Sequence, residues 1–405
     1  MMSNLPPIRR LVRGAAVTAC LLTVVVLAFA LIWPVTDLIA RHDVGSMEGI
    51  ARTLQLQEAR EAVRTQLLTV GAGVLAAGAL VYTALNFRLS RQGQVTDRYM
   101  KSVEQLGSRM VDVRIGGIYA LERIARDSRR DHPAVIEVLV AFTREHSHDQ
   151  GTPINENNDP SKRATRPDVQ SALTVIGRRN SRYDPGGMAL FCDLHGANLA
   201  DANLALGNFA VATLYNADLT RARFTDANLS GAALNNSILT GAYAVGANFA
   251  GAILIGATVI AAYFSGVNMS SALLTDADLT GTELLGANLT NTNLLRTNLT
   301  EANLTDAKLI DAQLLDANLT RANLKRARLR GANLAGADLA DTSFLAADMS
   351  NAWLLGASVV GADFSAANLT GAMWPKDFPE PPGWVRVDKN GELKRARSDT
   401  DINRS

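Results

Sequence analysis

Few residues in this chain have the type and spacing that chemistry requires. His146, His148 and Asp149 form a small group that could in principle bind a metal ion. Two His separated by a single residue in a polar loop, without a cluster of Cys or Glu ligands, are more often free in solvent. His195 is predicted to lie on the surface. The sequence contains no nucleophile–His–acid grouping and no Gly-rich phosphate loop, so we predict no catalytic residue, no metal site and no cofactor.

A second set of polar motifs is produced by a repeat. The acceptor pattern for N-linked glycosylation begins at Asn228, Asn288, Asn298 and Asn318. The tripeptides recur because the surrounding sequence recurs every five residues. A repeat centre stands at Leu194 and at every fifth position through Leu369, and all 36 centres except Ala244 are large and apolar. We therefore predict that these Asn residues belong to the architecture and are not glycosylated.

The period of the repeat identifies the kind of element that carries it. Two residues before each centre stands a small side chain, which is Ala in 28 of the 36 units. The residue directly before the centre is often Asn or Asp. A period of five fits neither a helix nor a flat strand. It fits a solenoid in which each pentapeptide forms one side of a square coil and points one large and one small side chain at the axis.

This pattern, A(D/N)LXX, resembles that of the pentapeptide-repeat family and covers nearly half of the chain. The resemblance implies an all-β solenoid over residues 190–373, a right-handed quadrilateral β-helix. Four units per coil would give about nine coils, and a spacing of about 4.8 Å would make the rod roughly 40 Å long.

With four units per coil, residues 20 positions apart should stack. Ala244 then falls between Phe224 and Phe264, and this large–small–large order is what a close-packed core requires. Surface residues at the same spacing are complementary in charge or are both aromatic. The predicted columns are Asp201–Arg221, Asp276–Arg296–Asp316, Glu301–Arg321–Asp341 and Tyr243–Tyr263.

One stretch of the repeat is strongly basic, and a phosphate or nucleic-acid patch is one interpretation of it. Its members are Arg321, Lys325, Arg326, Arg328 and Arg330. At the stacking distance of 20 residues, Arg326 meets Asp306, and Arg328 meets Asp348. We therefore interpret the stretch as a salt-bridge ladder.

Net charge and cysteine content limit the classes of partner and ligand that the chain is expected to bind. The 405 residues carry a net charge of +1, so bulk electrostatics predicts neither a nucleic-acid nor a lipid partner. Cys20 lies in an apolar run and Cys192 at an inward repeat position, so neither suggests a disulfide or a metal site.

Two uncharged apolar runs, residues 14–33 and 67–87, are each long enough to cross about 30 Å of hydrocarbon. The first could instead be a cleaved signal peptide, but its length favours a retained helix. The placement of Arg and Lys predicts a cytoplasmic tail at 1–13 and a short external loop at 34–66. We therefore expect a multi-pass protein of the cell (inner or plasma) membrane, held in lipid by two helices, with both termini and the rod cytoplasmic.

Residues 88–183 are predicted to form a cytoplasmic helical region that docks onto the first coil. The expected helices are Gln94–Arg109, Val111–Asp127, Pro133–Glu145 and Pro167–Arg179, with a polar loop at 147–166. The region resembles the segment ahead of the repeats in some bacterial membrane-bound pentapeptide-repeat proteins. The likeness lies in Gln105–Gly107, Gly116–Ala125 and Glu137–Leu139, and it implies no activity.

After Leu369 the repeat decays, and residues 374–405 are predicted to form a C-terminal cap and a disordered tail that starts at Arg395. Trp384–Val387 and Glu392–Leu393 should form a small hairpin. Solenoids need their open ends covered, so Trp374 and Trp384 are predicted to be cap residues.

These observations favour a non-enzymatic scaffold whose rod presents a protein-interaction surface at the membrane, with a partner that the sequence does not name and with homo-oligomers as one form. The alternative is a DNA mimic that modulates a type II topoisomerase, as the resemblance to the family suggests. Residues 190–373 hold 15 acids and nine bases, which is a weak charge for a duplex mimic. An enzyme or transporter is the third hypothesis, but the apolar runs contain no ionisable residue that would mark a path, and no small-molecule substrate is expected.

Overall fold

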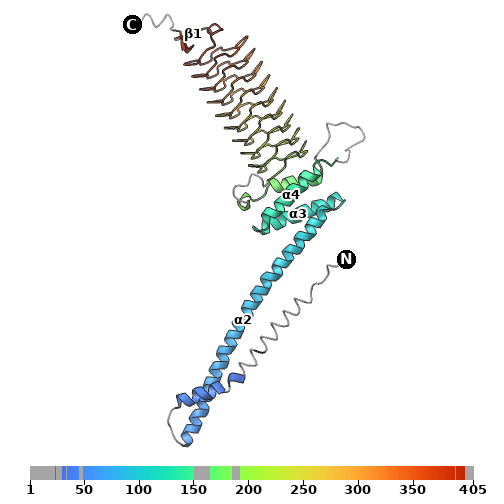
Figure 1. The fold of residues 1–405 in the computed structure, drawn as a ribbon, viewed down its shortest axis with the longest axis vertical. Helices are drawn as coiled ribbons and strands as arrows, with labels where there is room; N and C mark the ends of the chain where they lie inside the picture. Colours follow the sequence, from blue (N-terminus) through green and yellow to red (C-terminus); the bar gives the residue numbers. More distant parts are fainter. Residues whose placement is uncertain are drawn as a thin grey trace, which may run out of the picture. The chain divides into compact units, whose positions relative to one another are not determined.

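The computed structural model describes residues 23, 30–32, 34–44, 49–149, 165–184, 192–387 and 389–396. The chain divides into two compact units, Met1–Gln94 and Val95–Ser405, which are described separately. The first unit contains helical residues 34–43 and the first part of α2 (Ile50–Leu106), a continuous helix of 57 residues (Figure 1).

Among the described residues, one helix is long and apolar enough to cross a membrane, and its candidate span is Thr53–Arg88. The predicted segment 67–87 lies within it, and its apolar window is entirely exposed in the structure. The other predicted segment, 14–33, lies almost wholly outside the described residues, so two transmembrane helices are not shown. Residues 50–66, which we expected to belong to a connecting loop, are helical and form the beginning of α2. The polar composition suggested a loop, but uninterrupted helix formers such as Leu, Gln, Glu, Ala and Arg favour a helix.

The second unit begins with the end of α2, followed by α3 (Val111–Asp127), α4 (His132–His146) and α5 (Pro167–Gly177). The bounds of α3, α4 and α5 lie within two residues of the predicted helices. The predicted helix Gln94–Arg109 is the end of α2, which stops three residues earlier, at Leu106. Ile118, Leu121 and Ile124, which recur at helical spacing on α3, are buried. Val113 and Ile115 on the same helix are half-buried. Gly117 permits close contact with α2, because a Cβ there would lie 2.8 Å from the carbonyl oxygen of Ser102. A short 3₁₀ helix, η2 (Ser181–Tyr183), follows α5.

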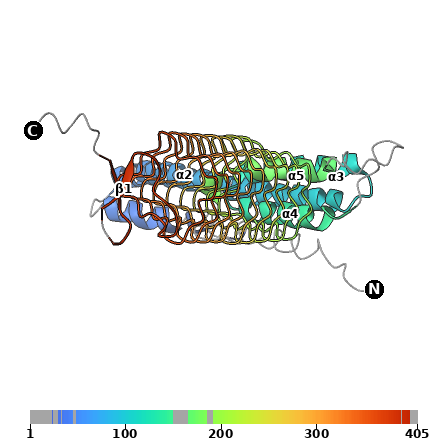
Figure 2. The same cartoon turned by 90° about the horizontal axis from the view of Figure 1, so that it is seen from above.

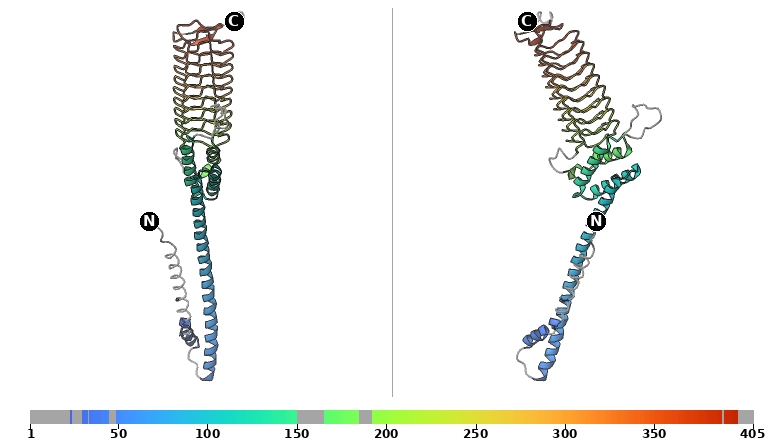
Figure 3. Two further views of the ribbon diagram at one scale, coloured as in Figure 1. Left: turned by 90° about the vertical axis from the view of Figure 1, so that its right-hand side faces the viewer. Right: turned by 45° about the vertical axis from the view of Figure 1, so that its right-hand side comes forward.

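The rod consists of stacked four-sided coils (Figures 2 and 3). Parallel bridges run from Asp193↔Thr213 to Trp353↔Met373, and every bridge joins residues 20 positions apart. The predicted four units per coil are therefore confirmed. The repeat centres and the small residues two positions before them fill the axis, and nearly all of them are buried. The columns place Phe224, Ala244 and Phe264 on the same side of the rod, as predicted.

Each pentapeptide turns its corner in the same way. The residue three positions after a centre donates its N–H to the carbonyl of that centre, as Ala202 does to Leu199 at 3.0 Å. The residue just before it has a positive φ, which is the requirement of a type II turn. Gly, Asn and Asp tolerate this conformation best, and they fill most of these corners. Val211, with a φ of 52°, is an unusual β-branched exception.

The Asn or Asp before each centre has a local role. Its side-chain oxygen accepts the N–H of the residue two positions later, as Asn288 accepts from Thr290 at 3.3 Å. The Thr hydroxyl adds a second bond to the same oxygen, at 2.8 Å. The Asn-Leu-Thr tripeptide is therefore a turn device, which explains why it recurs.

The helices of the second unit cap the first coil, as predicted. The open edge of that coil would leave backbone groups without partners, and buried groups of this kind are costly. Gln170 satisfies both groups of Asn203, accepting from its N–H at 2.8 Å and donating to its carbonyl at 2.7 Å. Ser147 accepts from Asn198 N–H, and Thr165 donates to the carbonyl of Ala200.

At the other end, a hairpin of β1 (Trp384–Arg386) and β2 (Leu393–Arg395) covers part of the last coil. The predicted hairpin is confirmed, although Arg395 belongs to β2 and not to the tail. Trp374 is buried, and its indole N–H donates to the carbonyl of Pro379 at 3.1 Å. Residues 397–405, predicted to be disordered, lie outside the described residues.

Candidate interaction surfaces

The rod has four sides, which we number by their units. Side 1 holds the units centred on Leu194 and every twentieth residue after it, and sides 2, 3 and 4 start in the same way from Leu199, Leu204 and Phe209. The residues before and after each centre point outward, because they alternate with the buried centre.

One section of the rod has no charge. No Asp, Glu, Lys or Arg occurs between Asp226 and Asp276, which is a run of more than two full coils. We call residues 227–275 the uncharged belt. It also contains no His and no Cys. In a chain of which 20% is charged, such a run leaves the outward positions to apolar and neutral polar side chains.

Large apolar side chains project from three sides of the uncharged belt. Those with more than a third of their surface exposed are Ile255 and Leu273 on side 1, Ile238 on side 2, and Tyr243, Val245 and Tyr263 on side 3. The rings of Tyr243 and Tyr263 stack with centroids 4.8 Å apart and planes 6° apart, which confirms the predicted pair. Exposed apolar residues grouped in this way commonly mark interaction sites.

Side 4 of the uncharged belt is polar. The amide of Asn248 donates to Asn228 at 3.2 Å, and that of Asn268 donates to Asn248 at 3.0 Å. Asn208 and Asn288 extend this ladder below and above. Because each side chain both donates and accepts along the column, side 4 has less unused hydrogen-bonding capacity than its composition suggests.

The charged residues lie mainly beyond the uncharged belt, and most of the predicted columns pair. Arg221 binds Asp201, Arg296 binds Asp276, Arg321 binds Glu301 and Arg326 binds Asp306. The hydrogen bond from Arg296 holds the pKa of Asp276 below its ordinary value, and Arg326 does the same for Asp306. The Asp201–Arg221 pair is half-buried, and the other three pairs are exposed. Exposed pairs fix side-chain positions more than they stabilise the fold.

Three of the predicted contacts form no salt bridge in the described part of the rod, namely Arg296–Asp316, Arg321–Asp341 and Arg328–Asp348. Arg328 and Asp348 do occupy adjacent coils. Asp348 instead accepts from the amide of Asn368 at 3.0 Å and from the backbone N–H of Ser350. Its carboxylate is thus held by neutral donors, and Arg328 remains exposed.

The His and Asp group at the end of α4 is an ion-pair cluster in the structure. Nδ1 of His146 lies 2.8 Å from the carboxylate of Asp149, which also binds Arg166 at 2.6 Å. The hydrogen bond with His146 is the main cause that lowers the pKa of Asp149. Among the described residues, no group of three or more potential metal ligands occurs. His195 is half-buried. Its Nδ1 lies 2.7 Å from the carboxylate of Asp193, and its ring stacks on Tyr215 with centroids 5.0 Å apart.

A buried ion pair ties the cap helices together. Nε of Arg114 on α3 donates to Asp168 on α5 at 2.6 Å, and both side chains are almost fully buried. Arg166 binds the same carboxylate at 2.9 Å. Cys192 is also buried, and burial raises the pKa of its thiol to about 12, so the thiol is unreactive.

Sequence reasoning missed two of these features. The uncharged belt is visible in the sequence as a charge-free run, but the rules of the repeat specify the buried positions and not the outward ones. The Arg114–Asp168 pair joins positions 54 residues apart, and no local pattern marks it.

The repeat also determines what the chain resembles. A family model for pentapeptide repeats matches residues 192–231, 227–266, 260–296, 282–321, 297–334 and 322–358. No curated protein matches the chain.

Several solved structures are similar over the rod. The crystal structure of HetL, a pentapeptide repeat protein involved in heterocyst differentiation regulation from the cyanobacterium Nostoc sp. strain PCC 7120, is 31% identical; the match covers 46% of this chain and 87% of HetL, with a TM-score of 0.24. The plasmid-mediated fluoroquinolone resistance protein QnrB1 is 19% identical over 40% of this chain and 84% of its own, with a TM-score of 0.32. A pentapeptide repeat protein from the thylakoid lumen of Arabidopsis thaliana is 24% identical over 34% and 68%, with a TM-score of 0.17.

All of these TM-scores are below 0.5, so the superpositions support no inference about function. The family model and the repeat itself carry the assignment. Through its rod, this chain belongs to the pentapeptide-repeat family, whose fold is the right-handed β-helix solenoid.

Proposed function

We propose that this protein is a non-enzymatic scaffold, anchored in the cell membrane, whose rod docks a protein partner through the uncharged belt. The single observation that carries the proposal is the absence of charge between Asp226 and Asp276, together with exposed apolar side chains on three of the four sides. The cores of protein interfaces are depleted in charge and enriched in Tyr, and the belt has both properties.

The chemistry of the uncharged belt favours binding over catalysis. General acid–base catalysis uses His, Glu, Asp, Lys, Cys or Tyr. Of these, the belt contains only Tyr. It is also unsuited to nucleic acid, because phosphate binding depends on Lys and Arg. A protein surface that is itself apolar and weakly charged is the partner that this chemistry selects.

Anchoring is proposed for α2 and for the apolar run at 14–33. The span Thr53–Arg88 exposes its apolar window completely, and exposed apolar surface of this length is stable only in lipid or against other helices. Arg88 ends the span, and Arg98 and Lys101 follow it. These cations favour a cytoplasmic location for what comes after the span. With a second membrane helix at 14–33, both termini and the rod would be cytoplasmic.

The test is a charge substitution in the full-length protein. Tyr243→Asp combined with Tyr263→Asp places two carboxylates on side 3 of the uncharged belt. The matched control is Asn248→Asp on side 4, at the same height on the rod. After crosslinking in intact cells, we expect the wild type and the control to give the same discrete adducts, and the double Tyr variant to lose them.

Two outcomes decide against the proposal. Equal adducts from all three proteins would show that the uncharged belt docks nothing. If the control Asn248→Asp also lost the adducts, the contact would not be specific to the apolar sides. Adducts that contain only this chain would identify the partner as a second copy, and the variants would then also change the oligomeric state.

The alternative, a DNA mimic that modulates a type II topoisomerase, has less support. A mimic needs closely spaced, unpaired acids. Asp201, Asp276, Glu301 and Asp306 are each bound by an Arg. Inhibition of supercoiling by the purified full-length protein would favour the alternative, and unaffected supercoiling would remove it.

A further inference from the structure

Three cations on side 4 have no anion bound to them. Lys308 and Arg328 occupy the same position in adjacent coils, and Arg330 stands two residues after Arg328. All three side chains are exposed, and none forms a salt bridge in the described part of the rod. Like charges directly opposite each other in neighbouring strands destabilise a sheet. The rod therefore keeps an unfavourable arrangement that its own contacts do not offset.

The two acids that flank these cations do not neutralise them. Asp348, in the coil above Arg328, accepts from the amide of Asn368 and from the N–H of Ser350. Asp311 stands at the corner between sides 4 and 1, and its carboxylate occupies the space that a Cβ on Gly331 would fill. Neither acid forms a salt bridge with a described residue of the rod. The three cations remain available to an anion from another molecule.

The opposite side of the rod carries acids of the same kind, in the coil of Arg328 and in the next one. Asp338 lies on side 2, and Asp316 and Asp341 lie at the corners where side 2 meets sides 1 and 3. All three are exposed. The Arg residues one coil below Asp316 and Asp341 bind acids of the coil beneath them, so these three acids have no salt bridge in the described part of the rod.

We propose that copies of this chain pack side by side, with side 4 of one rod against side 2 of the next, and with the rods parallel and in register. Sides 2 and 4 are opposite sides of a four-sided coil. A copy that is bound through one of them still offers the other. A contact between two different faces does not close on itself in this geometry, so it extends into an open row of rods.

The path of the chain around the coil determines which charges meet. Side 4 runs from the corner of side 3 to the corner of side 1, and side 2 runs in the opposite sense. In parallel rods at the same height, Arg330 near the side 1 corner faces Asp316 and Asp338, which lie near the same corner of the neighbouring copy. Arg328, nearer side 3, faces Asp341. Each facing pair is separated in height by less than one coil, which is about 4.8 Å.

The rest of the two faces permits a close approach. In the five coils below Lys308, the outward positions of side 4 carry only Asn, Ala, Ser and Thr, which are short and uncharged. The two acids of side 2 in those coils, Asp218 and Asp278, accept from the N–H groups of Thr220 and Thr280 at 2.9 and 3.0 Å. No further charge pair therefore opposes the contact, and flat sheet faces with side chains of this size pack about 10 Å apart.

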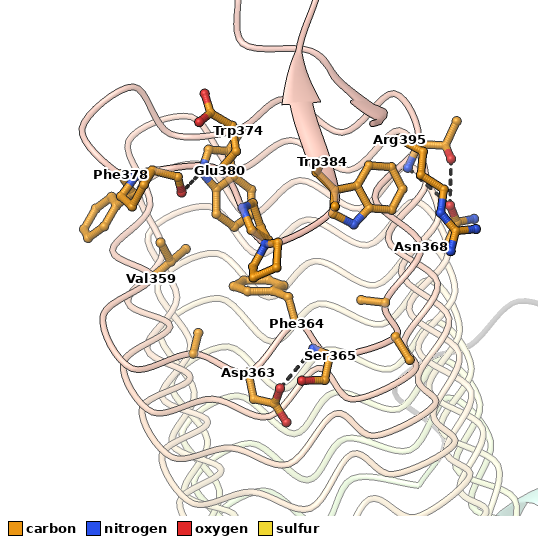
Figure 4. A pocket seen from close by; sticks show the side chains of 18 residues that line it. Val359, Asp363, Phe364, Ser365, Asn368, Trp374, Phe378, Glu380, Trp384 and Arg395 are labelled. Atoms are coloured by element: carbon orange, nitrogen blue, oxygen red, sulfur yellow. Dashed lines mark hydrogen bonds between the residues drawn. The ribbon is translucent and has the colours of Figure 1, made fainter. Parts of the chain in front are cut away.

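The contact ends below the last coil. Asp363 is the only charged residue between Asp348 and Lys376, and it lies on side 3. Its carboxylate accepts the N–H of Ser365 at 2.9 Å (Figure 4). The cavity of about 820 Å³ in the same view is lined by this coil and by the cap that follows it. The end of the rod therefore adds no charge to side 2 or side 4.

The row of rods does not depend on docking at the uncharged belt. It uses sides 2 and 4 and leaves Tyr243 and Tyr263, on side 3, exposed. Adducts formed through sides 2 and 4 would contain only this chain, and they should not change when both Tyr residues are replaced by Asp. The two proposals can therefore fail separately.

Site-directed crosslinking of the full-length protein in detergent tests the geometry. Thr258 on side 2 and Ser270 on side 4 lie in the same coil, three coils below Arg328, and both are near side 1. Cys20 is first replaced by Ser, and Cys192 is buried and unreactive. Thr258→Cys with Ser270→Cys should then give dimers, trimers and larger species with a bismaleimide that spans about 10 Å.

The single-Cys variants decide between an open row and a closed pair. Thr258→Cys alone and Ser270→Cys alone should remain monomeric, because each face meets a different face. Dimers from either single variant would show a two-fold contact and overturn the proposal. The absence of crosslinks in the double variant would also overturn it, since antiparallel rods would hold these two positions far apart.

A charge exchange tests the contact itself. In the two-Cys protein, Arg328→Asp with Arg330→Asp should reduce the crosslinked species by about tenfold or more, because several exposed pairs are replaced by repulsion at once. Asp316→Arg with Asp338→Arg should have the same effect. A mixture of the two proteins should recover the crosslinks, because the reversed side 4 of one meets the reversed side 2 of the other.

Arg223→Asp with Gln313→Asp is the control, since it adds acids to sides 3 and 1, which do not meet a neighbour in the row. It should leave the crosslinks unchanged. With every variant folded by circular dichroism, a mixture that fails to recover the crosslinks would overturn the proposal. So would crosslinks that are equal at about 0.1 M and about 1 M salt, because the screening length falls from about 10 Å to about 3 Å.

Discussion

Phe249 packs its ring against that of Phe264, with centroids 5.6 Å apart and planes 30° apart. It also meets Phe224, on the coil below, at 6.0 Å and nearly edge-on. Ala244 lies between Phe224 and Phe264 in their column. The small centre therefore exists because an aromatic ring from the neighbouring side takes the space beside it.

Exchanging these two side chains should reveal their coupling. Phe249→Ala should destabilise the rod by about 3–5 kcal/mol because it leaves a cavity. Ala244→Phe should cost about 1–3 kcal/mol by overpacking. The double variant should lose less than the sum, because the added ring refills part of the cavity. Urea unfolding of the full-length protein, followed by circular dichroism, measures this. If the loss of unfolding free energy in the double variant equalled the sum of the two single losses, the two side chains would not share a space.

The Tyr pair should matter more for docking than for folding. Tyr243→Ala removes an exposed stack, which is worth about 0.5–1.5 kcal/mol. Because a partner would bury the same ring, we expect a loss of crosslinked adducts that is much larger than the loss of stability. Asn248→Ala, in the side-chain ladder of side 4, should lower stability by about 0.5–1.5 kcal/mol and leave the adducts unchanged. If Asn248→Ala removed the adducts and Tyr243→Ala kept them, the docking surface would be on side 4.

The buried ion pair of the cap should make its stability depend on pH. Burial alone would raise the pKa of Asp168, but the hydrogen bonds from Arg166 and Arg114 outweigh it and hold the pKa below its ordinary value. A carboxyl with a lowered folded pKa stabilises the fold above its unfolded pKa of about 3.9, and the contribution is lost as the pH falls through the folded value. We therefore expect the helices to loosen below about pH 4.

The substitution Asp168→Asn should cost about 3–5 kcal/mol near pH 7, because it leaves Arg114 buried without an anion. The loss should be smaller at pH 3, below the unfolded pKa of about 3.9, because the contribution of the ion pair to the stability of the wild type is already falling there. Asp127→Asn is the control, since its pair with Arg123 is exposed and spans 3.9 Å, and it should cost less than about 0.5 kcal/mol. Helical circular dichroism in urea at the two pH values measures both. A cost for Asp168→Asn that does not depend on pH would contradict the assignment.

The sequence predicts the rod well because each unit obeys the same local rules. The five-residue period, the turn residues and the stacking distance of 20 residues all predict the same square coil. The pairing of Tyr243 with Tyr263 therefore follows from the sequence alone. Contacts that no local rule determines were not predictable. Phe249 enters the space beside Ala244 from a neighbouring side, and Gln170 satisfies the backbone of Asn203 across 33 residues. The Arg328–Asp348 pairing failed because Asp348 has neutral donors nearby, which stacking distance alone does not reveal.

The orientation of the rod is open to a direct chemical measurement. Cys192 is buried, and burial raises its pKa to about 12, so it should not react with a maleimide at pH 7. Gln313→Cys would place a thiol at an exposed position of side 1. If the rod is cytoplasmic, this thiol should react with a membrane-impermeant maleimide only after the cell membrane is permeabilised. The protein with Cys20 replaced by Ser is the background for the measurement, and it should remain unlabelled in both conditions. Suppose instead that Gln313→Cys is labelled while the cell membrane is still intact and only the layers outside it have been made permeable. The rod would then lie on the external side of that membrane, and the proposed topology would be wrong.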